Sequence, residues 1–221
     1  MSIAQEIINI NNELPSTVKL VAVSKFHPAE SIEQAYGAGQ RIFAESRPQE
    51  LAAKADVLPK DIEWHFIGHL QTNKLKMVVP HATLIHSVDS RRLLLEINKY
   101  ALNKGLKARC LLEMFIASEE SKQGFSKEEL LELMEELVKE PLEGVEICGL
   151  MGMASFTEDQ QMIRSEFTRL SDTFKYIKEK YGSSFPEFKE LSMGMSNDYP
   201  IAIECGSTLV RIGTRIFGSR Y

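Results

Sequence analysis

A lysine follows the first strand-like stretch of this chain. The stretch Lys19–Ser24 reads as a buried strand, Lys25 stands at its carboxyl end, and Pro28 introduces a short helix. A lysine at such a place can be a simple surface charge. Held in a desolvated pocket, its neutral amine can instead form a Schiff base with a carbonyl compound. The rest of the chain must decide between these two interpretations.

The loops late in the chain have the residue types of an anion site. Residues 192–198 combine Gly194, which lets a backbone approach a ligand closely, with side chains typical of helix N-caps. The first amides of the helix that follows are donors without partners inside it. These features favour a phosphate site, although ordinary turns use the same residues. The predicted contacts here are Met195, Ser196, Gly213 and Thr214.

Arg211 lies within the last strand-like stretch, two residues before Gly213. Arginine is always cationic and can only donate hydrogen bonds. If Arg211 faces a pyridine nitrogen, that nitrogen stays unprotonated and the ring is a weaker electron sink. A carbonyl cofactor with a phosphate group would join Lys25 to the predicted anion site, and pyridoxal 5'-phosphate (PLP) has this shape. The alternative is an outward-facing arginine in a surface ion pair.

Two histidines suggest a metal site only at first sight. His65 and His69 lie four residues apart, which is roughly 13 Å along a strand, so one metal ion cannot bind both. We expect His65 in the core and His69 at the pocket. The three cysteines show no metal-ligand spacing, and no metal site is predicted.

Eight strand-like stretches alternate with helices or loops through the whole chain. The expected helices cover residues 3–13, 28–36, 48–56, 72–79, 89–103, 127–139, 158–181 and 198–204. The expected strands are Lys19–Ser24, Arg41–Ser46, Glu63–His69, Leu84–Val88, Lys107–Ile116, Gly144–Met151, Phe188–Met193 and Thr208–Gly213.

This alternation predicts parallel strands joined by helical crossovers. Eight units in 221 residues favour a single (β/α)8 TIM-type barrel domain over residues 1–221, with an extra N-terminal helix. An open doubly wound sheet is the alternative, but the glycine fingerprint that often follows its first strand is absent. In a barrel the first and last strands are neighbours, which would place Lys25 beside the predicted phosphate site.

Composition limits the possible functions. The net charge is −5, which argues against a broad nucleic-acid surface, and no apolar run is long enough to cross a bilayer. The N-terminus lacks the basic and apolar regions of a signal peptide. Three widely spaced cysteines without a CxxC motif indicate a reduced, cytoplasmic protein. The sequence leaves a monomer and a weak dimer equally open.

Several segments closely resemble the pyridoxal phosphate homeostasis protein family (the YggS/PROSC group), and the resemblance covers nearly the whole chain. The segments that carry it are Leu20-Val-Ala-Val-Ser-Lys25, Trp64-His-Phe-Ile-Gly-His-Leu-Gln-Thr-Asn-Lys74, His86-Ser-Val-Asp89, Glu120-Ser-Lys-Gln-Gly-Phe125, Gly149-Leu-Met151, Leu191-Ser-Met-Gly-Met-Ser196, Gly206-Ser-Thr-Leu-Val-Arg-Ile-Gly-Thr214 and Ile216-Phe-Gly218.

The resemblance implies a barrel like the N-terminal domain of alanine racemase, known as PLP fold type III. Lys25 matches the family's Schiff-base lysine, Arg211 matches the arginine near the pyridine nitrogen, and residues 196, 213 and 214 match the phosphate contacts. The family is thought to bind, buffer or hand over PLP in vitamin B6 homeostasis without robust catalysis. Apo-enzymes that depend on PLP are the implied partners.

A PLP-dependent amino-acid racemase is the alternative function, and a Schiff-base aldolase without a cofactor is a third. Racemisation needs an acid/base group on each face of the reacting carbon. In racemases of this fold a tyrosine from a second domain and a partner subunit supplies one of them. This chain ends at Tyr221, shortly after the last expected strand, so we expect that group to be missing and favour a carrier or regulator.

The sequence departs from the family pattern at two places near the expected barrel mouth. It has Ala44-Glu45-Ser46 where the family usually has Gly-Glu-Asn, and Met114-Phe115 where Val-Asn is common. Loss of the amide at position 46 puts one polar contact to the cofactor in doubt. We expect Ser46 to supply a shorter one.

Overall fold

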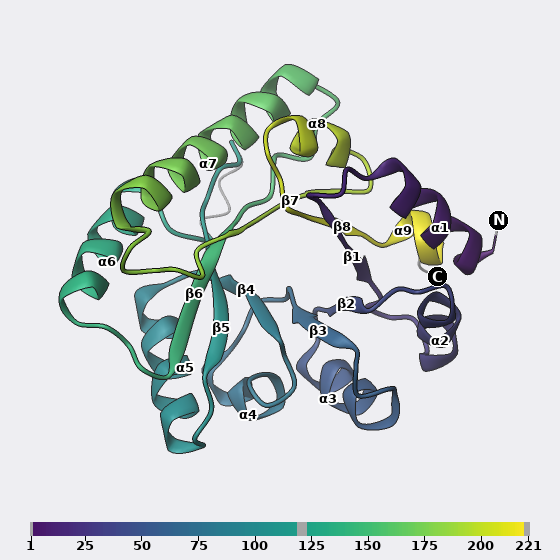
Figure 1. Cartoon of the computed structure of the whole chain (residues 1–221), viewed down its shortest axis with the longest axis horizontal. Helices are drawn as coiled ribbons and strands as arrows, with labels where there is room; N and C mark the ends of the chain where they lie inside the picture. Colours follow the sequence, from purple (N-terminus) through teal and green to yellow (C-terminus); the bar gives the residue numbers. More distant parts are fainter. Residues whose placement is uncertain (1, 119–122, 219–221) are drawn as a thin grey trace.

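Eight parallel strands close into a barrel in chain order, from β1 to β8 (Figure 1). The computed structural model describes residues 2–118 and 123–218. Pairing of β8 with β1, from Lys19 beside Leu209 to Ala22 beside Ile212, closes the ring and confirms the predicted TIM-type barrel. The strands are β1 Lys19–Val23, β2 Ile42–Glu45, β3 Glu63–Phe66, β4 Leu84–Val88, β5 Ala108–Glu113, β6 Val145–Met151, β7 Glu190–Met195 and β8 Leu209–Ile212.

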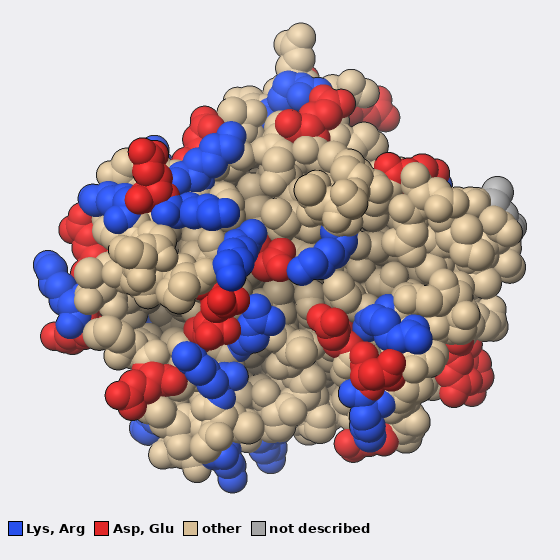
Figure 2. Space-filling model, in the orientation of Figure 1, with Lys and Arg blue, Asp and Glu red and all other residues tan. Residues whose placement is uncertain are grey.

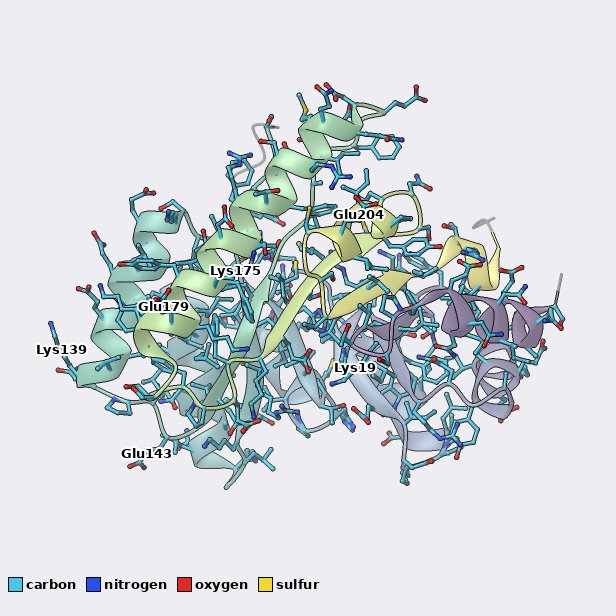
Figure 3. All side chains as sticks on the ribbon, turned by 45° about the horizontal axis from the view of Figure 1, so that its top comes forward. Lys19, Lys139, Glu143, Lys175, Glu179 and Glu204 are labelled. Atoms are coloured by element: carbon cyan, nitrogen blue, oxygen red, sulfur yellow. The ribbon has the colours of Figure 1, made fainter. Side chains whose placement is uncertain are left out.

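The helices surround the strands (Figure 1). They bury one apolar stripe against the sheet and expose the other side; on α7, for example, Lys175 and Glu179 lie on the outer surface (Figure 3). The helices are α1 Ile3–Glu13, α2 Ala29–Gly37, α3 Pro48–Val57, the 3-10 turn η1 Thr72–Lys74, α4 Leu75–Val78, α5 Arg91–Asn103, α6 Lys127–Lys139, α7 Gln160–Tyr181, α8 Tyr199–Glu204 and α9 Thr214–Phe217.

Several predicted element bounds need correction, among them the third strand, which ends at Phe66 rather than His69. The helix expected over residues 72–79 divides into η1 and α4, and α9 was not predicted. The fifth strand ends at Glu113, three residues earlier than expected. The seventh extends to Met195, past a register shift between Ser192 and Met195 where Gly194 adopts a φ of 94°. Residues 119–122, part of the family-like motif after β5, lie outside the described residues.

Two apolar layers hold the barrel together. The larger layer lies between strands and helices and includes fully buried side chains such as Phe43, Leu94 and Phe167. A smaller cluster has members on six of the eight strands: Val21, Ala44, Leu84, Leu111, Cys148, Met151 and Leu209. Short side chains alternate with large ones there, as expected for a filled barrel rather than an open channel.

Arg215 on α9 fixes the N-terminal helix to the end of the barrel. Its guanidinium contacts the carboxylates of Glu6 and Glu13 on α1, at 3.2 and 2.6 Å. Tyr199 on α8 donates to the same Glu13 at 2.9 Å. Helices from the two ends of the chain therefore lie side by side (Figure 1) and support the loops after β7 and β8.

Positive and negative side chains are interspersed on the face of the molecule seen in Figure 2. A broad basic field, which nucleic-acid binding would use, is not present on that face. Among the described residues, no helix is both long and apolar enough to cross a membrane.

Candidate functional site

A cavity of about 340 Å³ opens at the carboxyl ends of β1, β6, β7 and β8. This is the end of a (β/α)8 barrel where function gathers. Six of the seven residues that the sequence singled out line it together: Lys25, Met195, Ser196, Arg211, Gly213 and Thr214. Residues from opposite ends of the chain thus meet at one place because β1 and β8 are neighbours.

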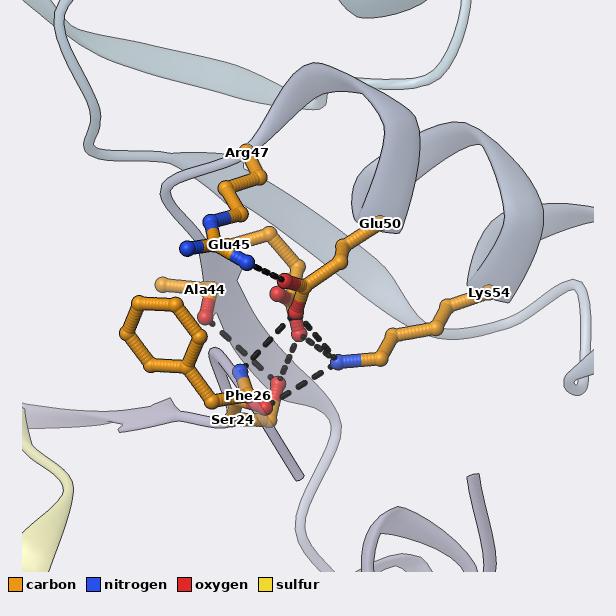
Figure 4. Close-up of polar contacts among 7 residues, drawn as sticks. All are labelled: Ser24, Phe26, Ala44, Glu45, Arg47, Glu50 and Lys54. Carbon is orange, nitrogen blue, oxygen red and sulfur yellow. Dashed lines mark hydrogen bonds and ion pairs between the residues drawn. The ribbon is translucent and has the colours of Figure 1, made fainter. Parts of the chain in front are cut away.

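Lys25 belongs to a tight turn directly after β1 and is half-buried at the cavity. The next residue, Phe26, has a φ of 68°, which is unusual for a residue with a side chain. The Phe26 amide donates to the carboxylate of Glu50 at 2.9 Å, and the Ser24 hydroxyl donates to Glu45 at 2.6 Å (Figure 4). Both neighbours of Lys25 are therefore held from outside the barrel.

A buried ion pair joins the groups that hold Ser24 and Phe26. We call Glu45, Glu50 and Lys54 the clamp. Lys54 on α3 contacts Glu45 at 2.8 Å, Glu50 at 3.3 Å and the backbone oxygen of Ser24 at 3.1 Å (Figure 4). Glu45 is fully buried, and its Oε2 has no hydrogen-bond partner among the described residues. Burial raises the pKa of Glu45 to about 7, against the charge of Lys54. Burial alone would raise the pKa of Glu50. The hydrogen bond from the Phe26 amide and the charge of Lys54 outweigh burial, so the pKa of Glu50 is lowered.

Two hydroxyl groups meet at the same cavity. Thr214, the first residue of α9, donates to Ser196 after β7 at 3.1 Å. Gly213 lies against β1, where an added Cβ would be 3.1 Å from the backbone oxygen of Val23. The two hydroxyls and the first amides of α9 are the donor types that bind a phosphate group.

Gly194 does not serve the ligand approach predicted from the sequence. A Cβ at this position would lie 2.6 Å from that of Ala202 and 2.9 Å from the Cα of Tyr199, both on α8. The glycine therefore lets α8 pack closely on β7. The Asp198 carboxylate accepts from the Met195 amide at 2.5 Å and closes the turn between them.

Arg211 on β8 is buried and faces the cavity rather than the outer surface. It donates to the backbone oxygens of Ser192 and Gly152, at 3.0 and 3.1 Å, and to the Ser192 hydroxyl at 2.6 Å. These three contacts use three of the five N–H donors of the guanidinium, so among the described residues the donors on Nε and one on Nη2 remain for a ligand. Burial lowers the pKa of Arg211 to about 10, against the attraction of Asp198 and Glu113, and the side chain stays cationic at neutral pH.

Two expected pocket residues lie elsewhere. Ser46 does not line the cavity; its backbone packs so closely on Gly68 that an added Cβ there would be 2.0 Å from the Ser46 oxygen. His69 is exposed and lies 3.2 Å from Asp89. Phe115, the other departure from the family pattern, lines a smaller adjoining cavity together with Met195.

The sequence did not reveal most of the apolar wall of the cavity. That wall comes mainly from the segment after β6 and includes Met153 and Phe156, while Ile163 on α7 adds to it. The position of this segment in the sequence could have indicated it, because a loop that follows a barrel strand is expected to line the mouth of the barrel. A larger cavity of about 400 Å³ lies at the opposite ends of β5 and β6, but it contains none of the predicted site residues.

Comparison with known proteins identifies the class of this barrel. Residues 2–221 match the sequence model of the alanine racemase N-terminal domain. Alanine racemase from Clostridium difficile has the same fold, with a TM-score of 0.75 at 16% identity. The chain spans 56% of that enzyme.

Within this class, the chain belongs to the pyridoxal phosphate homeostasis protein family. The relative from Synechocystis is 41% identical over 94% of each chain, and the one from Aquifex aeolicus is 39% identical over 91% of this chain and 87% of that relative. The structure of PipY from Synechococcus elongatus has a TM-score of 0.90 at 35% identity and covers 98% of this chain and 100% of its own. With PLP bound, PipY has a TM-score of 0.87, the same identity and the same coverage.

Proposed function

We propose that this protein binds PLP as a Schiff base on Lys25 and acts in PLP and vitamin B6 homeostasis in the cytoplasm, as a carrier or regulator rather than as an enzyme. The proposal takes residues 1–221 as a single barrel domain. One observation carries it: Lys25, Arg211 and the paired hydroxyls of Ser196 and Thr214 line one cavity. The names of the relatives and the PLP-bound PipY structure support it.

The chemistry of the lining residues fits each part of PLP. The Lys25 amine suits the aldehyde, the two hydroxyls with the first α9 amides suit the phosphate, and Arg211 offers a hydrogen-bond donor to the pyridine nitrogen. Apolar side chains such as Met151 and Ile67 suit the ring. A volume of about 340 Å³ lies within the usual range for small-molecule sites, roughly 300–1,000 Å³.

Attachment at Lys25 is reversible. The neutral Nζ forms a C=N bond with the aldehyde carbon, and the carbonyl oxygen leaves as water; hydrolysis reverses both changes. A cofactor held in this way can be stored and released. The clamp of Glu45, Glu50 and Lys54 fixes both neighbours of Lys25 and so keeps its Nζ at the cavity.

The remaining titratable groups at the cavity support a carrier rather than a racemase. A racemase needs a second proton donor and acceptor opposite the lysine. Among the described lining residues, the other titratable groups are Asp198, which accepts from the Met195 amide, and Arg211, which can only donate. Asp198 is thus engaged with the backbone, and Arg211 cannot accept a proton from a substrate carbon.

Release and turnover can be measured on the same preparation. Protein loaded with PLP and freed of excess by gel filtration is mixed with an apo-aminotransferase, whose activity reports the PLP that it receives. We expect the aminotransferase to gain activity, and L-alanine, L-serine and L-glutamate incubated with the loaded protein to stay optically pure. A racemase activity that disappears in Lys25→Ala would contradict the carrier role.

A further inference from the structure

A chain of four buried polar side chains crosses the interior of the barrel. His65 Nδ1 lies 2.9 Å from His86 Nε2, and His86 Nδ1 lies 3.0 Å from the Ser192 hydroxyl. That hydroxyl accepts from Arg211 at 2.6 Å. The four residues come from β3, β4, β7 and β8, and at most 4% of each is exposed. We call this chain the histidine relay.

Arg211 sets the direction of every hydrogen bond in the relay. Because a guanidinium only donates, Ser192 accepts from it, and His86 Nδ1 is the acceptor left for the Ser192 hydroxyl proton among the described residues. His86 then carries its proton on Nε2 and donates to His65 Nδ1. His65 is consequently protonated on Nε2 as well. The reverse arrangement would leave the buried Ser192 hydroxyl without an acceptor.

Both imidazoles in the relay are neutral at physiological pH. Burial, together with the charges of Lys19 and Arg109, lowers the pKa of His65 to about 3. Burial also lowers the pKa of His86, helped by Arg211. Lys19 and Arg109 belong to the opposite end of the barrel, where His65 borders a pit of about 30 Å³. The relay thus extends from that end to the ligand cavity.

We propose that His86 is a positioning residue that, through Ser192, holds Arg211 in the orientation in which it faces the ligand cavity, and that His65 fixes the tautomer of His86 needed for this. The proposal rests on the proposed function in one respect, since the ligand that Arg211 meets is taken to be PLP. Neither histidine is among the residues that line the cavity.

Removing the acceptor on His86 has a defined consequence. The Ser192 hydroxyl loses its acceptor, so the orientation of its 2.6 Å contact with Arg211 is no longer fixed by His86. The two backbone contacts of Arg211, to Ser192 and Gly152, remain. We therefore expect Arg211 to stay buried but to be displaced relative to the pyridine nitrogen, while Lys25 is unaffected.

The tautomers test the relay without any ligand. Imidazole nitrogen NMR spectra of the uniformly 15N-labelled, PLP-free protein are recorded between pH 5.5 and 8. We expect both His65 and His86 to show a proton on Nε2, a bare Nδ1 and no titration over this range. A proton on His86 Nδ1, or titration of either ring in this range, would overturn the proposal.

Three variants test the positioning role. We expect His86→Phe to weaken PLP binding about tenfold, as for loss of one hydrogen bond to a charged group, and to shift the visible absorption maximum of the bound cofactor. In His86→Asn the side-chain Oδ1 can replace Nδ1 as acceptor, so this variant should restore most of the PLP affinity and most of the absorption maximum. His81→Phe, outside the relay, is the matched control. An unchanged affinity and spectrum in His86→Phe would contradict the proposal. An equal loss of PLP affinity in His86→Phe and His86→Asn would also contradict it.

If His86→Phe fails to fold, Ser192→Ala removes the same link with a smaller change and is expected to shift the spectrum in the same direction. Failure of the proposed function is a separate outcome. A wild-type protein that takes up no PLP contradicts PLP binding, whereas the histidine spectra of the PLP-free protein still decide whether the relay exists.

Discussion

The hydroxyl groups of Ser196 and Thr214 lie 3.1 Å apart, although the two residues follow different strands of the barrel. Ser196 follows β7 and Thr214 begins the helix after β8. The pair is formed because parallel strands that are neighbours in a barrel end at the same edge. Thr214 donates to Ser196, and an anion bound between them would accept a hydrogen bond from each hydroxyl.

The first prediction concerns these hydroxyls. Thr214→Val preserves the shape of the side chain but removes its donor, and Ser196→Ala removes the other. We expect each change to weaken PLP binding about tenfold, as for one hydrogen bond to a charged group. Equilibrium dialysis measures the affinity. Thr168→Val, an exposed change on α7, serves as control, and equal affinities in all four proteins would show that the phosphate binds elsewhere.

The second prediction concerns the pH dependence of stability. The pKa of Glu45 is about 7 in the folded protein and 4.5 as its ordinary value, so the folded state retains a proton that the unfolded state releases. The stability linked to this proton is complete below pH 4.5 and is lost as the pH rises to about 7. Glu45→Gln removes this loss, which is about 3 kcal/mol for a pKa difference of this size.

Urea unfolding of Glu45→Gln and wild type at pH 4.5, 6 and 7.5 measures the effect. We expect the wild type to lose stability relative to the variant as the pH rises. Glu13→Gln is a control whose stability should stay parallel to that of the wild type over this range, because hydrogen bonds from Arg215 and Tyr199 lower the pKa of Glu13 to about 2. The contribution of Glu13 to stability changes only below pH 4.5. Parallel stability curves for wild type and Glu45→Gln would mean that Glu45 is ionised throughout.

The third prediction concerns a close contact between β6 and β7. An added Cβ on Gly149 would lie 1.7 Å from the backbone oxygen of Glu190, and the residue has a φ of 149°. We expect Gly149→Ala to destabilise the barrel by more than about 3 kcal/mol, since backbone rather than a flexible side chain must move. Gly37→Ala, with nothing within 4 Å, should leave the urea midpoint nearly unchanged. Equal midpoints in both variants would contradict this packing.

Much of the fold could be predicted from the sequence, because the strands are short apolar runs and the four longest helices have an apolar stripe and a side-chain cap. Ser126 and Glu129 form a capping box at α6, for example. Strand ends were harder to predict. The extension of β7 to Met195 depends on the φ of Gly194, which follows from the packing of α8 and not from local preference.

The candidate site could be predicted where a residue directly follows a strand, as Lys25 and Thr214 do. The prediction for Ser46 differs from the structure because β2 ends at Glu45, whose side chain contacts Lys54 on the outside, and the next residue packs on the neighbouring loop. The histidine relay could not be predicted. Its residues come from four strands. The stagger of the strands determines which side chains lie at the same height inside a barrel.

The direct test of the central claim is the chemical identity of the residue that holds PLP. Protein equilibrated with PLP is reduced with borohydride, digested and examined by peptide mass spectrometry, with Lys25→Ala treated in parallel. The proposed role predicts a single pyridoxyl group on Lys25, loss of the visible absorption band on reduction, and neither in the variant. A pyridoxyl group on another lysine, or equal labelling of wild type and Lys25→Ala, would contradict it.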